Sequence, residues 1–275
     1  MPSQENSRSP MMPLEVNVGE IVALIGPNGA GKTTAFNVIT GVYAPTNGRV
    51  SFNGECIVRN HPTGKMKKTY KGEDPAMYTA QFAPEETLDD EALKTWKEAQ
   101  KERDEYAFTD RILAPTPDKI TARGMARTFQ NIRLFKSETV YNNVLTACHA
   151  EADYNIFQSL WRLKAGPKWL TKYYYQEKAL REKTEELLKI MGIWEQRDMI
   201  AVNLPYGQQR KLEIARALAT NPKLLLLDEP AAGMNNDECN ELVEVLKKIH
   251  NELGFTVALI EHHIDFVMNL CNQYS

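Results

Sequence analysis

The feature that most constrains the fold of this chain is the stretch GPNGAGKT, Gly26 to Thr33, which fits G-x-x-x-x-G-K-[ST] in full. A nearly continuous apolar run, EIVALIG, precedes it and is typical of a buried parallel strand. An apolar-periodic helix follows and is predicted to end near Gly41. This is the strand–loop–helix context that a phosphate loop requires. The chain is therefore predicted to have an α/β fold with a parallel sheet.

The chemistry of a polyphosphate explains the residue types in this loop. Glycines let the backbone turn its N–H groups toward the phosphates, and the following helix adds its positive N-terminal end. Lys32 is predicted to reach the β- and γ-phosphates, and the Thr33 hydroxyl to ligate Mg²⁺. The strand and helix on either side disfavour the alternative, a glycine-rich turn with a chance lysine. The predicted nucleotide-binding residues here are Gly26, Pro27, Asn28, Gly29, Ala30, Gly31, Lys32, Thr33 and Thr34.

A second chemical element is LLLLDEP, Leu224 to Pro230, in which four leucines precede two carboxylates. The leucines predict a buried strand, and ligands of open α/β sheets bind at the carboxyl ends of strands. Asp228 is predicted to hold Mg²⁺, and Glu229 to orient and deprotonate an attacking water. A solvated strand end is the alternative, and the phosphate loop in the same chain disfavours it.

Composition excludes several other classes of protein. The formal net charge of the 275 residues is -3, which does not indicate a nucleic-acid binder. The four cysteines are scattered without CxxC or zinc spacing, so free thiols are expected. No apolar run approaches the roughly 20 residues of a membrane span, and the polar N-terminus has no signal-peptide core. We expect a cytoplasmic protein that reaches a membrane only through a partner.

Secondary structure can be predicted for most of the remaining chain. GRVSFNGE, Gly48 to Glu55, indicates a hairpin, and residues 137–203 indicate several helices. Residues 60–116 look like an insertion, with an acidic helix that begins near Thr87. A solvated decoration is the default for this segment, and a regulatory or docking role is the alternative. A helix over Cys239 to Leu253 and a strand over Phe255 to Glu261 are expected near the end.

The stretch NLPYGQQRKLEIARAL, Asn203 to Leu218, places a Gly-Gln-Gln turn at the front of an amphipathic helix. Its apolar side is predicted to contain Leu212, Ala215, Leu218 and Ala219. The charged side chains of Arg210, Lys211 and Glu213 are predicted to lie off that side.

Four further features carry a resemblance to a known family. They are Gln130 in ARTFQNIRLF, the LPYGQQ turn, AAGMNN directly after the Asp-Glu pair, and His262 in LIEHH. In this order they resemble the ATPase subunits of ATP-binding cassette (ABC) transporters. Residues 14–58 and 118–275 are more closely similar to the LivG-type ATPases of branched-chain amino acid importers.

The resemblance implies a P-loop NTPase (RecA-like) core with a parallel sheet, a small antiparallel β part and a helical subdomain. The implied division is 14–135 for the first part of the core with the insertion at about 60–116, 136–203 for the helical subdomain, and 204–275 for the second part of the core.

The resemblance also implies roles for individual residues. The implied catalytic residues are Glu229, His262 and Gln130, and the implied metal-binding residues are Thr33, Gln130 and Asp228. Two such subunits sandwich two ATP molecules, so Tyr206, Gly207 and Gln208 would contact ATP held by the partner's phosphate loop. His262 is preferred over His263 because the family has the sequence I-E-H.

The resemblance further implies partners and a location. Residues near 131–144 and the helices beyond would bind integral membrane permease subunits. A homologous ATPase subunit would complete a hetero- or homodimer, with the heterodimer favoured. Other subunits would bind the cargo, and no direct contact with nucleic acid is expected. The protein would be cytoplasmic and peripheral on the inner face of the cell membrane.

The chain departs from the family pattern at several points. Pro205 replaces the usual serine of the signature turn, Tyr206 replaces a glycine, and Asn235 stands where many relatives have an aspartate. The first aromatic residue is Phe36, so an adenine-stacking aromatic before the phosphate loop is absent. Base stacking contributes about 1–3 kcal/mol, so its loss would weaken ATP binding by roughly tenfold or more. We expect an incomplete copy, truncated at both ends.

The sequence thus predicts an ATP-hydrolysing subunit, with ATP and Mg²⁺ as cofactors, that energises an importer of branched-chain amino acids. A transporter for another cargo, such as urea or lipopolysaccharide, is one alternative. An ABC ATPase acting on DNA or ribosomes is another, and it usually carries long coiled coils or a second cassette. A regulatory ABC-type protein without turnover is disfavoured by the intact Lys32, Asp228 and Glu229.

Overall fold

The computed structural model describes residues 14–27, 29–45, 48–60, 113–149, 167–271 and 273–274. These residues fall into two compact units. We call the first the sheet unit, which contains the described residues of 14–33 and those from 121 onward. The second, with the described residues from 34 to 120, is the hairpin unit. The predicted acidic helix near Thr87 lies outside the described residues.

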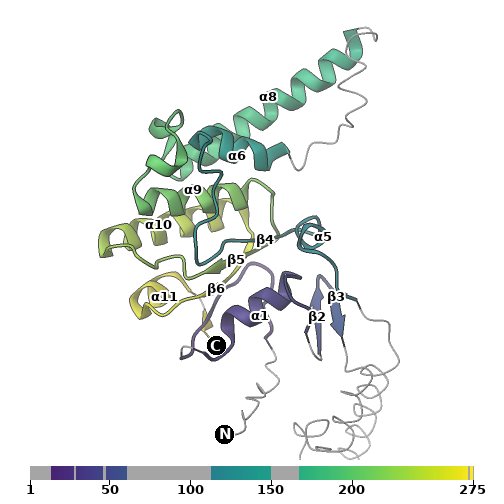
Figure 1. Cartoon of the computed structure of the whole chain (residues 1–275), viewed down its shortest axis with the longest axis vertical. Helices are drawn as coiled ribbons and strands as arrows, with labels where there is room; N and C mark the ends of the chain where they lie inside the picture. Colours follow the sequence, from purple (N-terminus) through teal and green to yellow (C-terminus); the bar gives the residue numbers. More distant parts are fainter. Residues whose placement is uncertain are drawn as a thin grey trace, which may run out of the picture. The chain divides into compact units, whose positions relative to one another are not determined.

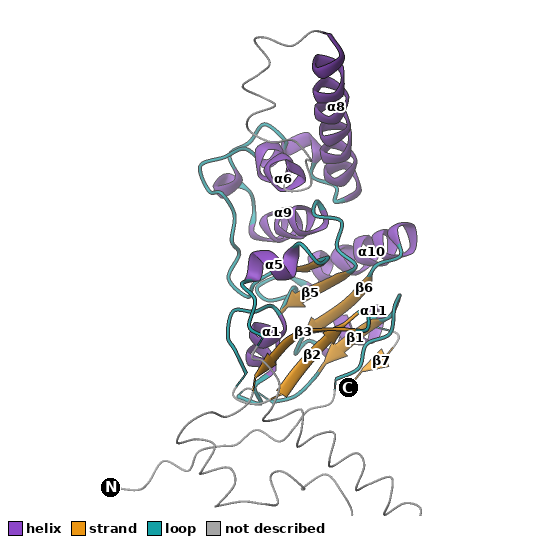
Figure 2. Cartoon of the chain, turned by 90° about the vertical axis from the view of Figure 1, so that its right-hand side faces the viewer, coloured by secondary structure: helices purple, strands orange, loops and turns teal. Residues whose placement is uncertain are grey.

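The sheet unit is built on a parallel sheet of five strands in the order β4-β5-β6-β1-β7. Figures 1 and 2 show β5, β6 and β1 side by side within this unit. Apolar runs explain the central strands, because a strand covered on both faces needs no polar alternation. All four residues of β1 are buried, as are all five of β6. The strands are β1 (Ile21–Leu24), β4 (Met125–Arg127), β5 (Leu224–Asp228), β6 (Thr256–Ile260) and β7 (Gln273–Tyr274).

One apolar cluster joins alternate residues of the sheet to the helices of this unit. Leu225 and Leu227 of β5, for example, share the cluster with residues of each long helix beyond the sheet. The shorter helix α6 packs against both α8 and α9, as Figures 1 and 2 show. The helices are α6 (Val140–Cys148), α8 (Pro167–Ile190), η4 (Trp194–Gln196), η5 (Ala201–Asn203), α9 (Tyr206–Leu218), α10 (Asn236–Leu253) and α11 (Ile264–Leu270).

The hairpin unit holds the antiparallel pair β2 (Gly48–Phe52) and β3 (Glu55–Asn60). Asn53 and Gly54 connect the strands with φ of 52° and 77°. Two positive φ angles give the turn type that matches the twist of a hairpin. The predicted hairpin is therefore confirmed. The unit also holds most of α1 (Lys32–Ile39), whose first two residues belong to the sheet unit, and α5 (Pro117–Thr121), which ends at the boundary.

Helix α9 differs from its prediction in one respect. Leu212, Ala215, Leu218 and Ala219 are buried as expected. However, Arg210, Lys211 and Glu213 are also buried, with exposed fractions of 0%, 5% and 2%. The apolar periodicity identified the helix but did not show that charged residues on its other sides are buried with partners. Lys211 pairs with Glu241 of α10, and the partners of Arg210 and Glu213 are described below.

The remaining predictions about composition can be compared directly with the structure. All four cysteines are free, as expected from their spacing. Among the helices that the structure describes, none combines the length and the apolar character that a membrane span requires. The boundaries predicted for the three parts of the chain remain a prediction.

The central strand β6 supplies a test of the core. Leu259 is fully buried, so Leu259→Ala removes apolar contacts and leaves a cavity. We expect its free energy of unfolding to fall by about 2–5 kcal/mol, measured by urea denaturation. Leu253→Ala is the matched control, since 56% of this leucine is exposed, and it should change stability by about 0.5 kcal/mol or less. Equal losses in both variants would contradict the assigned core.

Candidate active site at the carboxyl edge of the sheet

Strand register brings the ends of three strands into one row. Leu24 of β1 and Asp228 of β5 are both paired with Ile260 of β6. The strands are parallel, so the loops that follow them leave from the same edge of the sheet. This edge therefore collects the phosphate loop, the Asp-Glu pair and the Glu-His segment, although they are far apart in sequence. It is the position at which open α/β sheets bind ligands.

The phosphate loop occupies the connection between β1 and α1. Gly29 and Gly31 have φ of 83° and 86°, a region that residues with a Cβ rarely adopt. Lys32 opens α1, and its Nζ donates to the carbonyl oxygens of Gly26 at 2.6 Å and Pro27 at 2.9 Å. The ammonium thus lies across the start of the loop. Thr33 and Thr34 are exposed in the first turn of α1, and Asn28 lies outside the described residues.

Asp228, the last residue of β5, is 1% exposed and forms a buried ion pair. Its Oδ2 accepts from Arg127 Nη2 at 2.7 Å, and Arg127 ends the neighbouring strand β4. Its Oδ1 is also buried and has no hydrogen-bond partner in the described part of the chain. A buried carboxylate oxygen without a partner is costly, so a ligand that satisfies it would be favoured. One oxygen of Asp228 is thus held and the other is available.

Glu229 brings together the three residues that were predicted to be catalytic. Its Oε2 accepts from Gln130 Nε2 at 2.8 Å, and its Oε1 lies 3.3 Å from His262 Nε2. Glu229 has φ of 49°, a conformation that costs a residue other than glycine roughly 1–2 kcal/mol. Such strain persists where the surroundings fix the backbone and is common at functional sites. Here the Glu229 N–H donates to Ile260 O at 2.9 Å and ties the turn to β6.

Glu261 organises the loops on either side of this group. Its buried carboxylate accepts from three backbone N–H groups, those of Ala231 at 2.7 Å, His262 at 2.9 Å and His263 at 3.2 Å. The turn after β5 and the turn after β6 are therefore held by one side chain. This explains how a loop residue such as His262 acquires a fixed position beside Glu229.

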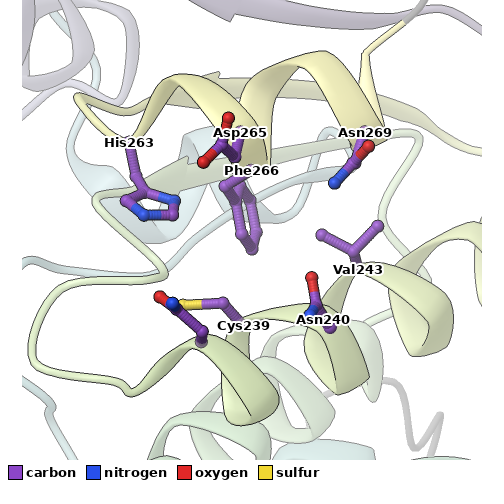
Figure 3. A pocket seen from close by; sticks show the side chains of 8 residues that line it. Cys239, Asn240, Val243, His263, Asp265, Phe266 and Asn269 are labelled. Atoms are coloured by element: carbon purple, nitrogen blue, oxygen red, sulfur yellow. The ribbon is translucent and has the colours of Figure 1, made fainter.

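The two adjacent histidines point to different places. His263 lines a pocket of about 250 Å³ between α10 and α11, where Figure 3 shows it beside Asp265 and opposite Cys239. Burial raises the pKa of the Cys239 thiol, and the nearby carboxylates of Glu261 and Glu238 raise it further. This cysteine is therefore a poor nucleophile. Of the two histidines, His262 is the one paired with Glu229.

The signature turn packs against the segment that follows the Asp-Glu pair. A Cβ on Gly207 would lie 2.7 Å from Glu238 Oε1, so a side chain at this position would require the Glu238 carboxylate to move. Tyr206 is 44% exposed, and its ring lies over Gly233. No hydrogen bond or ion pair among the described residues joins Tyr206, Gly207 or Gln208 to the phosphate loop of the same chain.

The side chains at this edge also include oxygen atoms that could bind a divalent cation. No group of three or more His, Cys, Asp and Glu residues gathers in the described ranges. Magnesium in nucleotide sites, however, uses one or two carboxylates with hydroxyl, water and phosphate oxygens. The free Oδ1 of Asp228, with the amide of Gln130 and the hydroxyl of Thr33, fits that kind of site.

Two residues that contact this group, Arg127 and Arg210, were not predicted from the sequence. Arg127 could have been found as the charged end of a short strand next to the strand that carries Asp228. Arg210 could have been found from its i,i+3 spacing to Glu213, a helical pairing distance. Periodicity does not identify the partners of buried charges, so it gave no signal for either residue.

A parallel sheet with a glycine-rich phosphate loop after one strand and an Asp-Glu pair at the same edge defines a P-loop nucleotide-binding protein. A family model described as ABC transporter matches residues 11–232. The chain therefore belongs to the ABC transporter family, as an ATP-binding, ATP-hydrolysing subunit, and its predicted fold class is confirmed.

Individual relatives agree with this assignment. The chain is 33% identical over 260 residues to the high-affinity branched-chain amino acid transport ATP-binding protein BraF of Pseudomonas aeruginosa, covering 94% of this chain and 78% of the relative. It is equally similar, over 261 residues and with the same coverage, to LivG of Salmonella typhimurium, which bears the same description. The predicted resemblance to this group of ATPases is confirmed.

Solved structures agree as well. The ADP conformation of MJ1267, an ATP-binding cassette of an ABC transporter, superposes with a TM-score of 0.59 at 26% identity, covering 94% of this chain and 76% of the other. A nucleotide-free ATP-binding cassette from an ABC transporter gives 0.58 at 26% identity, covering 94% and 77%. The arrangement of strands and helices is thus that of an ABC cassette.

The buried pair of Asp228 and Arg127 gives a test of the site in the absence of ligand. Asp228→Asn leaves the Arg127 charge buried beside a neutral group, so the free energy of unfolding should fall by about 3–5 kcal/mol. Asp198→Asn is the control, because 87% of that side chain is exposed in its pair with Arg197, and it should cost about 1 kcal/mol or less. Urea denaturation measures both, and a change below about 1 kcal/mol in Asp228→Asn would refute the pair.

Proposed function

We propose that this chain is the ATPase subunit of an importer for branched-chain amino acids, and that Glu229, Gln130 and His262 form its catalytic group. The observation that carries the assignment of roles is the joint contact of Gln130 and His262 with Glu229 at the edge that holds the phosphate loop. The cargo is inferred from the relatives that bear that description.

The chain's own residues account for the steps of ATP hydrolysis. Lys32 exchanges the carbonyl oxygens of Gly26 and Pro27 for phosphate oxygens, which attract an ammonium more strongly because they are charged. Glu229 orients a water and accepts its proton as the water oxygen attacks the γ-phosphorus and the bond to ADP breaks. Gln130 fixes one oxygen of Glu229, which leaves the other beside His262. His262 donates toward the developing negative charge.

Magnesium is the expected second cofactor, and Thr33, Gln130 and Asp228 would hold it. When bound, it neutralises charge on the β- and γ-phosphates. Arg127 orients Asp228 by holding Oδ2, and it leaves the buried Oδ1 without a partner in the described part of the chain, as the oxygen that would contact the metal.

Permease subunits of a membrane complex are the proposed partners, with this chain peripheral on the inner face of the membrane. The supporting surface lies where residues 135–140 run beside residues 199–202, joined by backbone hydrogen bonds from Val140 N to Met199 O and from Ala201 N to Glu138 O, both 2.9 Å. Large apolar side chains are exposed there, which is typical of a protein-binding surface. They are Phe135, Met199, Ile200 and Val202, with exposed fractions of 48%, 41%, 36% and 52%.

A homologous ATPase subunit is the other proposed partner. Tyr206, Gly207 and Gln208 would face the nucleotide held by that subunit, since no bond among the described residues ties them to the phosphate loop of their own chain. Pro205 offers no hydroxyl, so backbone N–H groups at the start of α9 would contact the phosphate.

The first test is the affinity of the full chain for Mg-ATP, measured by calorimetry. We expect binding, and we expect Lys32→Ala to weaken it at least about tenfold, because charge-assisted hydrogen bonds contribute roughly 1.5–3 kcal/mol. Lys189→Ala is the control, since that lysine is more than half exposed and pairs with Glu185 on α8. A folded chain with equal affinity in all three forms would remove Lys32 from its role.

The second test separates chemistry from binding. Glu229→Gln keeps the shape of the side chain and an oxygen for Gln130, but it removes the group that accepts the proton. Turnover should fall by roughly 10²–10⁴-fold while ATP affinity changes little. Glu244→Gln, at an exposed position of α10, should leave both unchanged. Phosphate release and calorimetry give the two quantities, and wild-type turnover in Glu229→Gln would exclude it as the base.

A further inference from the structure

The buried pair of Arg210 and Glu213 on α9 binds the backbone of the loop that carries Gln130. We define this loop, residues 129–133, as the glutamine loop. Arg210 Nη1 donates to Phe129 O at 2.7 Å, and Nη2 donates to Gln130 O at 2.8 Å. Glu213 Oε1 accepts from the N–H groups of Phe129 at 3.4 Å and Arg133 at 3.1 Å. Four backbone groups of the glutamine loop are thus bound by two side chains of one helix.

The pair itself is fully enclosed. Arg210 Nη1 lies 2.7 Å from Glu213 Oε2, and the exposed fractions of the two side chains are 0% and 2%. A buried ion pair is favourable only when hydrogen bonds satisfy its remaining donors and acceptors. Here backbone groups of the glutamine loop supply most of these bonds. The position of the loop and the stability of the pair therefore depend on each other.

The same arginine also reaches the start of the helix. Its Nη2 lies 3.3 Å from the Tyr206 hydroxyl, and its guanidinium lies 6.0 Å from the centre of the Tyr206 ring. Tyr206 is the first residue of α9 and belongs to the signature turn. At the other end of the network, the Gln130 side chain binds Glu229. One chain of contacts therefore leads from the signature turn to the proposed base.

We propose that Arg210 and Glu213 are positioning residues that hold the glutamine loop against the start of α9 and thereby fix the placement of Gln130. This rests on the role proposed above for Gln130. Arg210 and Glu213 act through Gln130 and touch no reacting atom.

The test compares two variants of the full chain. Single substitutions leave a buried charge unpaired and endanger folding, so the main variant is the double substitution Arg210→Met with Glu213→Leu. Apolar residues of similar volume often replace a buried ion pair without loss of stability. The matched control is Lys211→Met, on the same helix as the pair, which breaks a 2.6 Å ion pair between Lys211 and Glu241 of α10. Lys211 is also buried, but this pair makes no contact with the glutamine loop.

Hydrogen exchange of residues 129–133 is the first readout. In the double variant the amides of Phe129 and Arg133 lose their acceptor, and we expect their exchange to accelerate at least about tenfold. Lys211→Met should exchange like wild type in this segment. Unchanged exchange in a folded double variant would overturn the proposal, as would equal acceleration in Lys211→Met, because the effect would then be a general loosening of α9.

Kinetics supply the second readout. Misplacement of a catalytic group by about 1 Å can cost roughly 10²-fold. We therefore expect turnover of the double variant to fall by at least about tenfold, with the Mg²⁺ concentration for half-maximal rate raised and ATP affinity within about threefold of wild type. Wild-type turnover and Mg²⁺ dependence in the double variant would contradict the positioning role. If wild type itself neither binds nor hydrolyses ATP, the proposed function fails, and hydrogen exchange still decides whether the pair holds the loop.

Discussion

The pairing of Leu24 and Asp228 with the same residue of β6, Ile260, is the constraint on which the rest of the site depends. A parallel register fixes where each strand ends relative to its neighbours. A shift of one residue would reverse the direction of each side chain and move the Asp-Glu pair out of line with the phosphate loop. Burial on both faces specifies that register, because a shift would disrupt the close packing around each strand residue. The chemistry at this edge is thus set by packing within the sheet.

Buried charges then turn this edge into a structured site. Three carboxylates are enclosed there, and each has a different set of partners. Asp228 is held by an arginine, Glu213 by an arginine and two backbone N–H groups, and Glu261 by three backbone N–H groups. Because removing one partner leaves an uncompensated charge, each network resists local movement. Glu229, whose side chain is 19% exposed, is more accessible than these three and is the proposed catalytic base.

The sequence was sufficient for β1, β5 and β6, the phosphate loop and the edge at which it lies, because continuous apolar runs and the G-x-x-x-x-G-K-T spacing are compatible with few folds. It placed Gln130 and His262 at strand ends by position, and the structure joins both to Glu229. It could not give the positive φ of Glu229, which depends on the Glu229 N–H bond to Ile260. Nor could periodicity distinguish Arg210 from a solvated charge, because its partners lie about 80 residues away in the glutamine loop.

The absence of the usual serine from the signature turn can be understood by comparing the N-terminal caps of three helices. Thr139 caps α6, and Asn235 forms a capping box with Glu238 at α10, so side chains satisfy amide groups of both first turns. Pro205 precedes α9 and supplies no such cap, and the first-turn amides of α9 therefore keep their capacity for an external acceptor. A helix start with free N–H groups favours an anion through both hydrogen bonds and the helix dipole. Replacement of the family serine by proline thus removes one donor, and the backbone donors that a γ-phosphate would require remain.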